Sequence, residues 1–186
     1  RPYRTLARAK QDVRYNGFPD WVLLKRGDTF NEPLEGWGFS GRSATEPFVI
    51  TNYGPESQPR PIVTPTSTDS PGMNTSAPSV SHFAIVGVHF KAATTGNGQS
   101  GILAGGAGTN RLYEDLLIEG FQVGMFIETS LQVSDIRIRR CTIVDQWSSR
   151  GGHSQGILAN NIDGLLIEES IFDHNGWKAP NVVSPG

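Results

Sequence analysis

The chain has little of what several common classes of protein require. A single cysteine, Cys141, among 186 residues excludes an intrachain disulfide and leaves the redox compartment open. No apolar run approaches the ~18 residues of a membrane-spanning helix. The net charge is −2 without any block of basic residues, and no His/Cys cluster has zinc-site spacing. We therefore expect neither nucleic acid nor a membrane as a partner.

What the chain does contain is turn residues and a repeat. The 22 glycines and 12 prolines fall between short β-rich runs, a pattern typical of many turns and few helices. Residues 135–143 (DIRIRRCTI) and 164–172 (GLLIEESIF) align at a spacing of 29, which places Ile138 over Ile167 and Ile143 over Phe172. A unit that recurs in this way buries its apolar side by stacking on its neighbours.

Three columns of expected inward positions extend this repeat. They are Ile85, Tyr113, Ile138 and Ile167; Val88, Leu116, Cys141 and Ser170; and Phe90, Ile118, Ile143 and Phe172. A second strand type recurs at 101–103, 124–126 and 156–158, each time beginning with glycine. Parallel strands buried on one face produce such columns. The sequence predicts an all-β fold, a right-handed parallel β-helix of about five or six coils.

We expect one domain, 1–186, with its coils over 18–177. Residues 2–13 are the best helix candidate, with Thr5 as N-cap, and 1–17 would form a helical cap over the first coil. Residues 64–79 are rich in Ser, Thr and Pro and are interpreted as a surface loop. Residues 178–186 are interpreted as a tail or a truncated continuation. An uncapped last coil exposes strand edges, which predicts self-association.

Two segments resemble a known superfamily. Residues 153–157 (HSQGI) followed by 163–177 (DGLLIEESIFDHNGW) resemble the right-handed parallel β-helix proteins of the pectin-lyase-like superfamily, and 23–30 (LLKRGDTF) resemble their first coil. The chain is particularly similar to secreted bacterial members that act on acidic polysaccharides. This resemblance implies an extracellular or periplasmic protein with a polysaccharide as its partner. No signal peptide is visible, and the chain begins at Arg1.

One corner of the expected β-helix carries loops of unequal length. The third column and the following strand are separated by 11, 6 and 13 residues in successive coils, while the strands stay in step. Variable loops on a fixed scaffold are where functional residues concentrate. The candidate catalytic residues at this corner are Asp145, Arg150, His153, Asp173 and His174. The candidate substrate-binding residues are Lys91, Trp147, Trp177 and Lys178.

These residue types suit a polysaccharide lyase. β-Elimination from a uronic acid needs a cation near the carboxylate, a base for the adjacent C–H and an acid for the leaving oxygen. His153 or His174 could serve as the base, and Arg150 or Lys178 as the cation. A lyase of uronic-acid-containing polysaccharide is therefore the leading interpretation.

The same corner also suits a glycoside hydrolase, which needs two carboxylates. Asp145 and Asp173 fall on adjacent coils, about 4.8 Å apart in backbone position. Trp147 and Trp177 flank the same loops, and aromatic faces stack on sugar rings. No cofactor is required by the sequence, although Asp145, Asp173 and loop carbonyls have the ligand types of a calcium site.

A non-catalytic role is the third alternative. Residues 173–176 (DHNG) are good turn formers, because Asp and Asn side chains bond to turn backbone. The chain could thus be a carbohydrate-binding or structural module, or a fragment of a larger protein. Residues 152–156 (GHSQG) match the nucleophile elbow of serine hydrolases, but that motif needs a preceding strand and a following helix. Here a loop precedes the match and a strand is expected after it.

Overall fold

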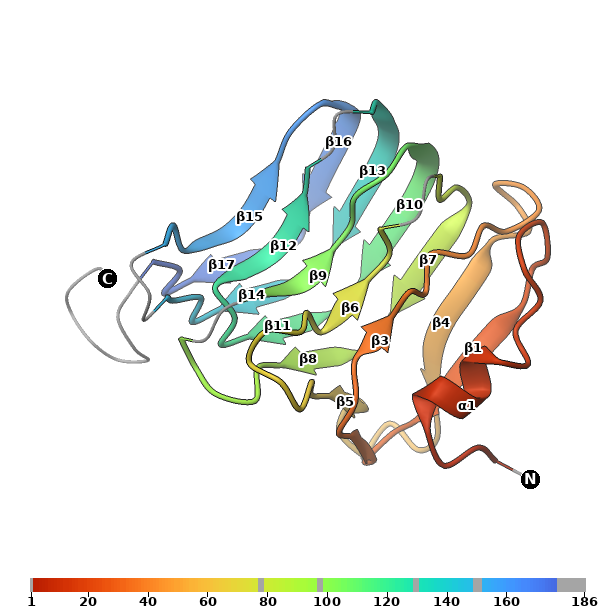
Figure 1. Cartoon of the computed structure of the whole chain (residues 1–186), viewed down its shortest axis with the longest axis horizontal. Helices are drawn as coiled ribbons and strands as arrows, with labels where there is room; N and C mark the ends of the chain where they lie inside the picture. The colour runs from red at the N-terminus through yellow and green to blue at the C-terminus, as the bar shows by residue number, and fades with distance from the viewer. Residues whose placement is uncertain (1, 77–78, 97–98, 129–130, 149–151, 177–186) are drawn as a thin grey trace.

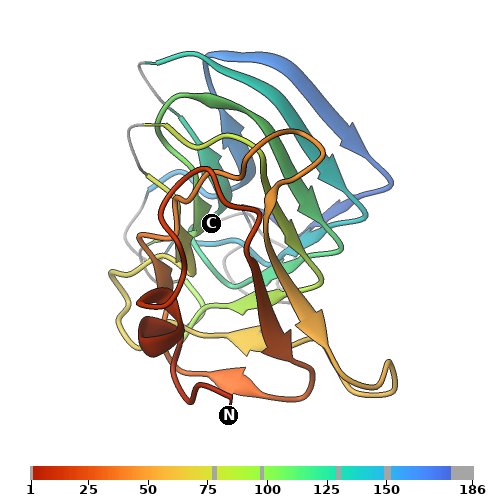
Figure 2. The same ribbon diagram turned by 90° about the vertical axis from the view of Figure 1, so that its right-hand side faces the viewer.

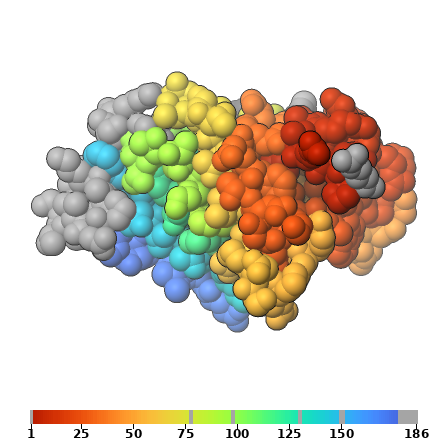
Figure 3. Space-filling model, turned by 90° about the horizontal axis from the view of Figure 1, so that it is seen from below, coloured from red at the N-terminus to blue at the C-terminus, as the bar shows by residue number. Residues whose placement is uncertain are grey.

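The computed structural model describes residues 2–76, 79–96, 99–128, 131–148 and 152–176. The chain winds into a parallel β-solenoid of about five turns, with one short helix at its N-terminal end (Figure 1). The coils follow one another along the long axis of the molecule (Figure 3). The expected all-β solenoid is confirmed.

Each coil contributes strands to three sheets. Sheet A consists of β1 (Trp21–Lys25), β4 (Phe48–Tyr53), β7 (Phe83–Val86), β10 (Gly108–Glu114), β13 (Val133–Arg139) and β16 (Ile162–Glu168). Sheet B consists of β2 (Thr29–Phe30), β5 (Ile62–Val63), β8 (His89–Lys91), β11 (Leu117–Glu119), β14 (Thr142–Val144) and β17 (Ile171–Asp173). Sheet C consists of β3 (Leu34–Glu35), β6 (Met73–Asn74), β9 (Ser100–Leu103), β12 (Val123–Ile127) and β15 (Gln155–Ala159).

The expected inward columns form the core. Ile138 pairs directly with Ile167 and Tyr113, and Ile143 pairs with Phe172 and Ile118. Burying one such side chain contributes roughly 1.5–3 kcal/mol. A slip of one residue would turn every member of a column toward solvent, so these columns fix the register.

The second column lies in the corner between sheets A and B. Asp115, Arg140 and Glu169 each have a φ close to +50°, in the left-handed region. This conformation turns the chain sharply and sends the next residue inward, as it does for Leu116 and Cys141, which are 0% and 1% exposed. The corner therefore needs only two residues between the strands.

Cys141 is expected to be chemically inert in the folded protein. Burial raises the pKa of its thiol to about 11, so almost no thiolate exists at neutral pH. A thiol-reactive dye should label the native protein very slowly and the urea-unfolded protein completely. Rapid stoichiometric labelling of the native protein would contradict this burial.

The N-terminal helix is shorter than expected and covers only part of the first coil. The structure has α1 over Leu6–Lys10 instead of 2–13, and Thr5 caps it by accepting a hydrogen bond from the Arg8 amide. After Lys10, bonds from Asp12 and Val13 reach back only three residues, which tightens the last turn and ends the helix. Helix α1 lies to one side of the mouth of the solenoid (Figure 2).

The interpretation of 64–79 as a surface loop is wrong in part. The segment contains β6, and Met73 within it is fully buried and pairs with Ile102 of the next coil. A two-residue strand is too short to show a period in sequence. The Ser, Thr and Pro residues around it concealed one inward methionine.

A column of glycines accompanies sheet C. Gly72, Gly101, Gly124 and Gly156 occupy equivalent positions at or just before strands β6, β9, β12 and β15. A Cβ atom on Gly101 would lie 2.7 Å from the carbonyl oxygen of Gly124, and one on Gly124 would overlap the Gly156 carbonyl oxygen and the Ile143 side chain. Only glycine therefore fits where sheet C approaches the side chains of sheet B.

One charged side chain lies inside the solenoid. Arg111 is 1% exposed and occupies an inward position of sheet A, between Phe83 and Ile136. Its Nε donates to the Val80 carbonyl at 2.9 Å, and its Nη2 contacts the carbonyls of Gly106 and Ala107. Within the described ranges no carboxylate pairs with it. The guanidinium thus serves to bind backbone carbonyls of the corner between sheets C and A.

Candidate functional site

The candidate site begins as a row of charged residues at the end of sheet B. The parallel register places Lys91, Glu119, Val144 and Asp173 side by side on consecutive coils. The Lys91 Nζ lies 2.8 Å from Glu119 Oε1, and the His89 Nε2 lies 3.3 Å from the same oxygen. Lys91, predicted from sequence as a substrate-binding residue, is therefore held by a carboxylate that sequence reasoning did not select.

The next corner adds Asp145 and His174, both predicted from sequence. Both residues have left-handed backbones, with φ of +59° and +52°, and the Asp145 amide donates to the Asp173 carbonyl at 3.2 Å. The structure thus brings Asp145, Asp173 and His174 together on adjacent coils. The His174 Nδ1 lies 3.0 Å from Asp173 Oδ2, and the His174 amide donates to Asp173 Oδ1 at 2.9 Å.

The environment of Asp145 favours its protonated form. Burial raises the pKa of this carboxyl first, the negative charges of Glu119 and Asp173 raise it further, and His174 opposes them. A carboxylic acid that keeps its proton to higher pH can donate it to a leaving group. Asp145 is therefore the described residue of this corner best suited to act as a general acid.

Two buried amides hold the corner in place. The Gln146 Nε2 donates to the carbonyls of Ile118 and Val144 at 2.9 and 2.7 Å. The Asn175 Nδ2 donates to the Ile143 carbonyl at 3.0 Å, and its Oδ1 accepts from the Gln146 amide at 3.3 Å. Gln146 directly follows Asp145, and Asn175 directly follows His174. Their ladder fixes the backbone of both candidate residues, and its only signal in the sequence is the 29-residue spacing.

His153 and Trp147 lie in the segment that leads into β15. His153 is exposed, and its carbonyl accepts a hydrogen bond from Gln122 Nε2 at 3.2 Å. A Cβ on Gly176 would lie 3.4 Å from the Ser154 carbonyl oxygen, so this segment runs beside the turn that contains His174. Trp147 is half-buried, because its ring packs against Gly96. Its role in binding sugar remains a prediction.

Three predicted residues, Arg150, Trp177 and Lys178, lie outside the described residues. Among the residues that the structure does describe, no group of three or more His, Cys, Asp or Glu side chains is arranged to hold a metal ion. The calcium site at Asp145 and Asp173 remains a prediction. In the same part of the chain, no helix is long and apolar enough to cross a bilayer.

The solenoid and its charged corner were compared with known proteins. No family model matches. Neither the curated proteins nor the solved structures contain a match to the chain. The strand register therefore carries the assignment of the fold, and the pectin-lyase-like resemblance of 153–157 and 163–177 serves as one support for a proposal.

Proposed function

We propose that this protein is an extracellular or periplasmic enzyme of the pectin-lyase-like type that cleaves a uronic-acid-containing polysaccharide by β-elimination. The observation that carries the proposal is the grouping of a proton-retaining carboxyl, Asp145, with the Asp173–His174 pair on the next coil. A row of charges running along the solenoid suits a polymer whose sugars repeat along its length. The sequence resemblance points to the same substrate class.

The corner can supply both proton transfers of the reaction. With its proton on Nδ1, neutral His174 donates to Asp173 and has its lone pair on Nε2, the form of a general base. His174 would take the proton next to the sugar carboxylate, the C–O bond to the leaving sugar would break, and Asp145 would protonate the departing oxygen. Lys91 would bind a substrate carboxylate further along the row, and Arg150 is the predicted cation at the cleaved sugar.

The direct test is to incubate the protein with alginate, pectate and glycosaminoglycans. β-Elimination leaves a double bond conjugated to the carboxylate, so the ultraviolet absorbance of the products should rise on one substrate. Absence of product on every polymer, together with retained binding, would instead support the non-catalytic module.

Asp145→Asn should abolish activity and stabilise the fold. The amide cannot donate an acidic proton, so the rate should fall by at least about 100-fold. The raised pKa means that the proton on Asp145 favours folding below the ordinary value of about 3.9 and that this contribution is lost as pH rises through the raised value. At about pH 7 the variant should therefore resist urea better than the wild type, and at about pH 3 this difference should disappear.

His174→Asn and Asp163→Asn complete this experiment. Asparagine tolerates the left-handed backbone of residue 174, so His174→Asn should lose activity without unfolding. Asp163 is an exposed carboxylate on β16, and Asp163→Asn should leave the rate unchanged. Equal activity of the wild type and both corner variants would place the reaction elsewhere.

Hydrolysis is the second candidate, and the stacking of Asp145 with Asp173 favours it. One carboxyl that retains its proton beside a second carboxylate is the arrangement that glycoside hydrolases use. New reducing ends without a rise in ultraviolet absorbance would identify hydrolysis. Under that outcome Asp173→Asn should be as inactive as Asp145→Asn.

A further inference from the structure

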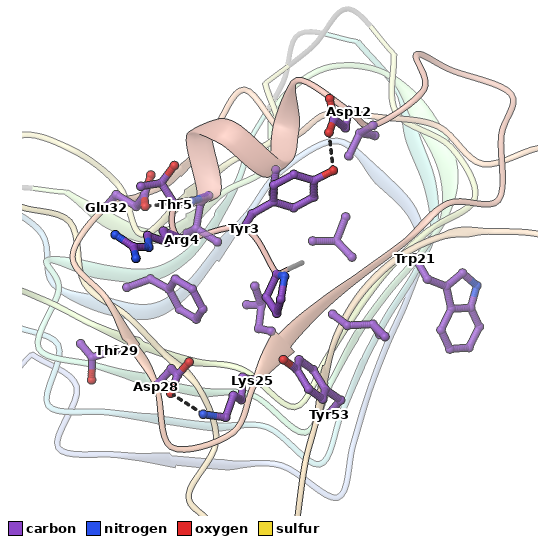
Figure 4. A pocket seen from close by; sticks show the side chains of 18 of the residues that line it. Tyr3, Arg4, Thr5, Asp12, Trp21, Lys25, Asp28, Thr29, Glu32 and Tyr53 are labelled. Carbon is purple, nitrogen blue, oxygen red and sulfur yellow. Dashed lines mark hydrogen bonds and ion pairs between the residues drawn. The ribbon is translucent and has the colours of Figure 1, made fainter.

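The N-terminal end of the solenoid is only half covered. Helix α1 lies beside the edge of sheet C, where Glu32 accepts hydrogen bonds from the Leu6 and Ala7 amides and the Lys10 Nζ donates to the Glu35 carbonyl. Strands β1 and β2 instead border a cavity of about 1370 Å³. Figure 4 shows this cavity between the helix with Tyr3 on one side and the strand with Trp21 and Lys25 on the other.

Strand β1 presents an unpaired ladder to this cavity. The Asp20 carbonyl accepts from the Val49 amide, and the Arg26 amide donates to the Tyr53 carbonyl. Even-numbered residues therefore point toward β4, and the backbone groups of Trp21, Leu23 and Lys25 point away from it. As the edge of sheet A, β1 can accept one further parallel strand.

The described C-terminal end has the complementary form. Leu165, Ile167 and Phe172 continue inward columns, yet they are 38%, 42% and 42% exposed, whereas Ile138 and Ile143 beneath two of them are fully buried. Strand β16 is the other edge of sheet A, and β17 is an edge of sheet B.

Among the described residues the sixth coil contains strands of sheets A and B but none of sheet C, which ends at β15. The C-terminal end thus has a step over β15. The N-terminal end has a protrusion at the matching place, because α1 lies beside β3 at the edge of the same sheet.

We propose that the chain associates head to tail with a second copy of itself. Strand β1 of one copy would extend sheet A by pairing with β16 of the next, β2 would pair with β17, and α1 would enter the step over β15. All strands are parallel, so a shift along the solenoid axis places the edges in the correct direction. In the continued register Trp21 of one copy lies over Leu166 of the other, and these side chains are 66% and 46% exposed.

The charges of the two ends favour this orientation. Residues 159–176 contain four acidic residues and no Lys or Arg, whereas residues 2–32 contain six basic and four acidic ones. Glu168 and Glu169 are partly neutralised by Arg139 and Arg140 of the preceding coil, which leaves Asp163 and Asp173 as the main source of negative charge. Opposite charges steer the N-terminal end of one copy to the C-terminal end of another and disfavour pairing of like ends.

The contact is heterologous, because each copy uses two different surfaces. A translation along the axis does not close, so growth should continue into linear chains. Sedimentation velocity over a hundredfold range of protein concentration should show a series of increasingly elongated oligomers. High salt should shift this series toward the monomer by screening the end charges.

Two end variants test the geometry. Leu166→Glu places a charge on the C-terminal contact, and Trp21→Glu places one on the N-terminal contact. Each alone should be monomeric, and an equimolar mixture should form a dimer that grows no further, because each variant retains one intact end. Leu131→Glu is the matched control, since Leu131 is 49% exposed on the side of the solenoid, and it should assemble like the wild type.

Three results would overturn the proposal. The first is a wild type that stays monomeric at every concentration. The second is a dimer of wild type or of Trp21→Glu that is lost only with Leu166→Glu, which would mean that two C-terminal ends pair. The third is a mixture of the two variants that stays monomeric while the circular dichroism of each shows an intact fold.

Discussion

Replacing Arg111 by alanine is expected to destabilise the protein by about 3–5 kcal/mol. The substitution removes a large side chain from the core and leaves a cavity. It also leaves the carbonyls of Val80, Gly106 and Ala107 without the guanidinium that they contact, and each buried unsatisfied acceptor costs roughly 1–3 kcal/mol. Urea denaturation of the wild type and the variant measures the difference.

Two further variants separate the volume of Arg111 from its hydrogen bonds. Arg111→Met fills most of the space, so the stability that it fails to restore reports the lost donors. Arg137→Ala removes an exposed arginine of the next coil, whose side chain is 53% exposed, and should change stability by less than about 0.5 kcal/mol. An Arg111→Met protein as stable as the wild type would show that the carbonyl contacts contribute nothing.

Gly124→Ala is expected to cost about 3 kcal/mol or to prevent folding. The new methyl group would overlap the Gly156 carbonyl oxygen and the Ile143 side chain. Overpacking of this kind costs typically about 1–3 kcal/mol, and more when backbone must move. Because the Gly156 oxygen belongs to the neighbouring strand β15, relief of the overlap requires two coils to separate.

Gly105→Ala is the control for this substitution. A Cβ at residue 105 would lie 3.1 Å from the Ser76 Oγ, and a side-chain hydroxyl can rotate away. Its thermal midpoint should remain within a few degrees of the wild type. Similar midpoints for Gly124→Ala and Gly105→Ala would show that the glycine column is not a packing requirement.

The sequence predicted the repeat because apolar side chains mark it. Ile138 and Ile167 are large, inward and equivalent, so a spacing of 29 residues is visible in the letters alone. The corner residues Asp145, Asp173 and His174 follow from the same spacing, and the structure places them on adjacent coils. Register is a property that one sequence can reveal when one face is buried.

Other features were missed because their residue types usually mean something else. Arg111 occupies a core position although arginine is ordinarily exposed, and nothing in the sequence shows that three carbonyls converge there. Strand β6 was hidden in a segment whose composition is typical of loops. Glu119 was overlooked because its importance depends on contacts with His89 and Lys91, which appear only once the strands are paired.

The extent of helix α1 was overestimated for a related reason. A three-to-four-residue period in 2–13 indicates one apolar side, but it does not show how much surface is available to receive that side. Leu6 is buried against the core, whereas Val13 is only partly buried. Tertiary contacts with Glu32 and Glu35 decide the length of the helix.

The stacking of coils at intervals of 25–29 residues also governs how the chain reaches its native state. Every lateral strand pair closes a loop of nearly the same size, so no step requires a much greater loss of entropy than another. Folding can then start at any two adjacent coils and spread in both directions. Coils in the middle have neighbours on both sides, so the native structure should fray from its ends inward.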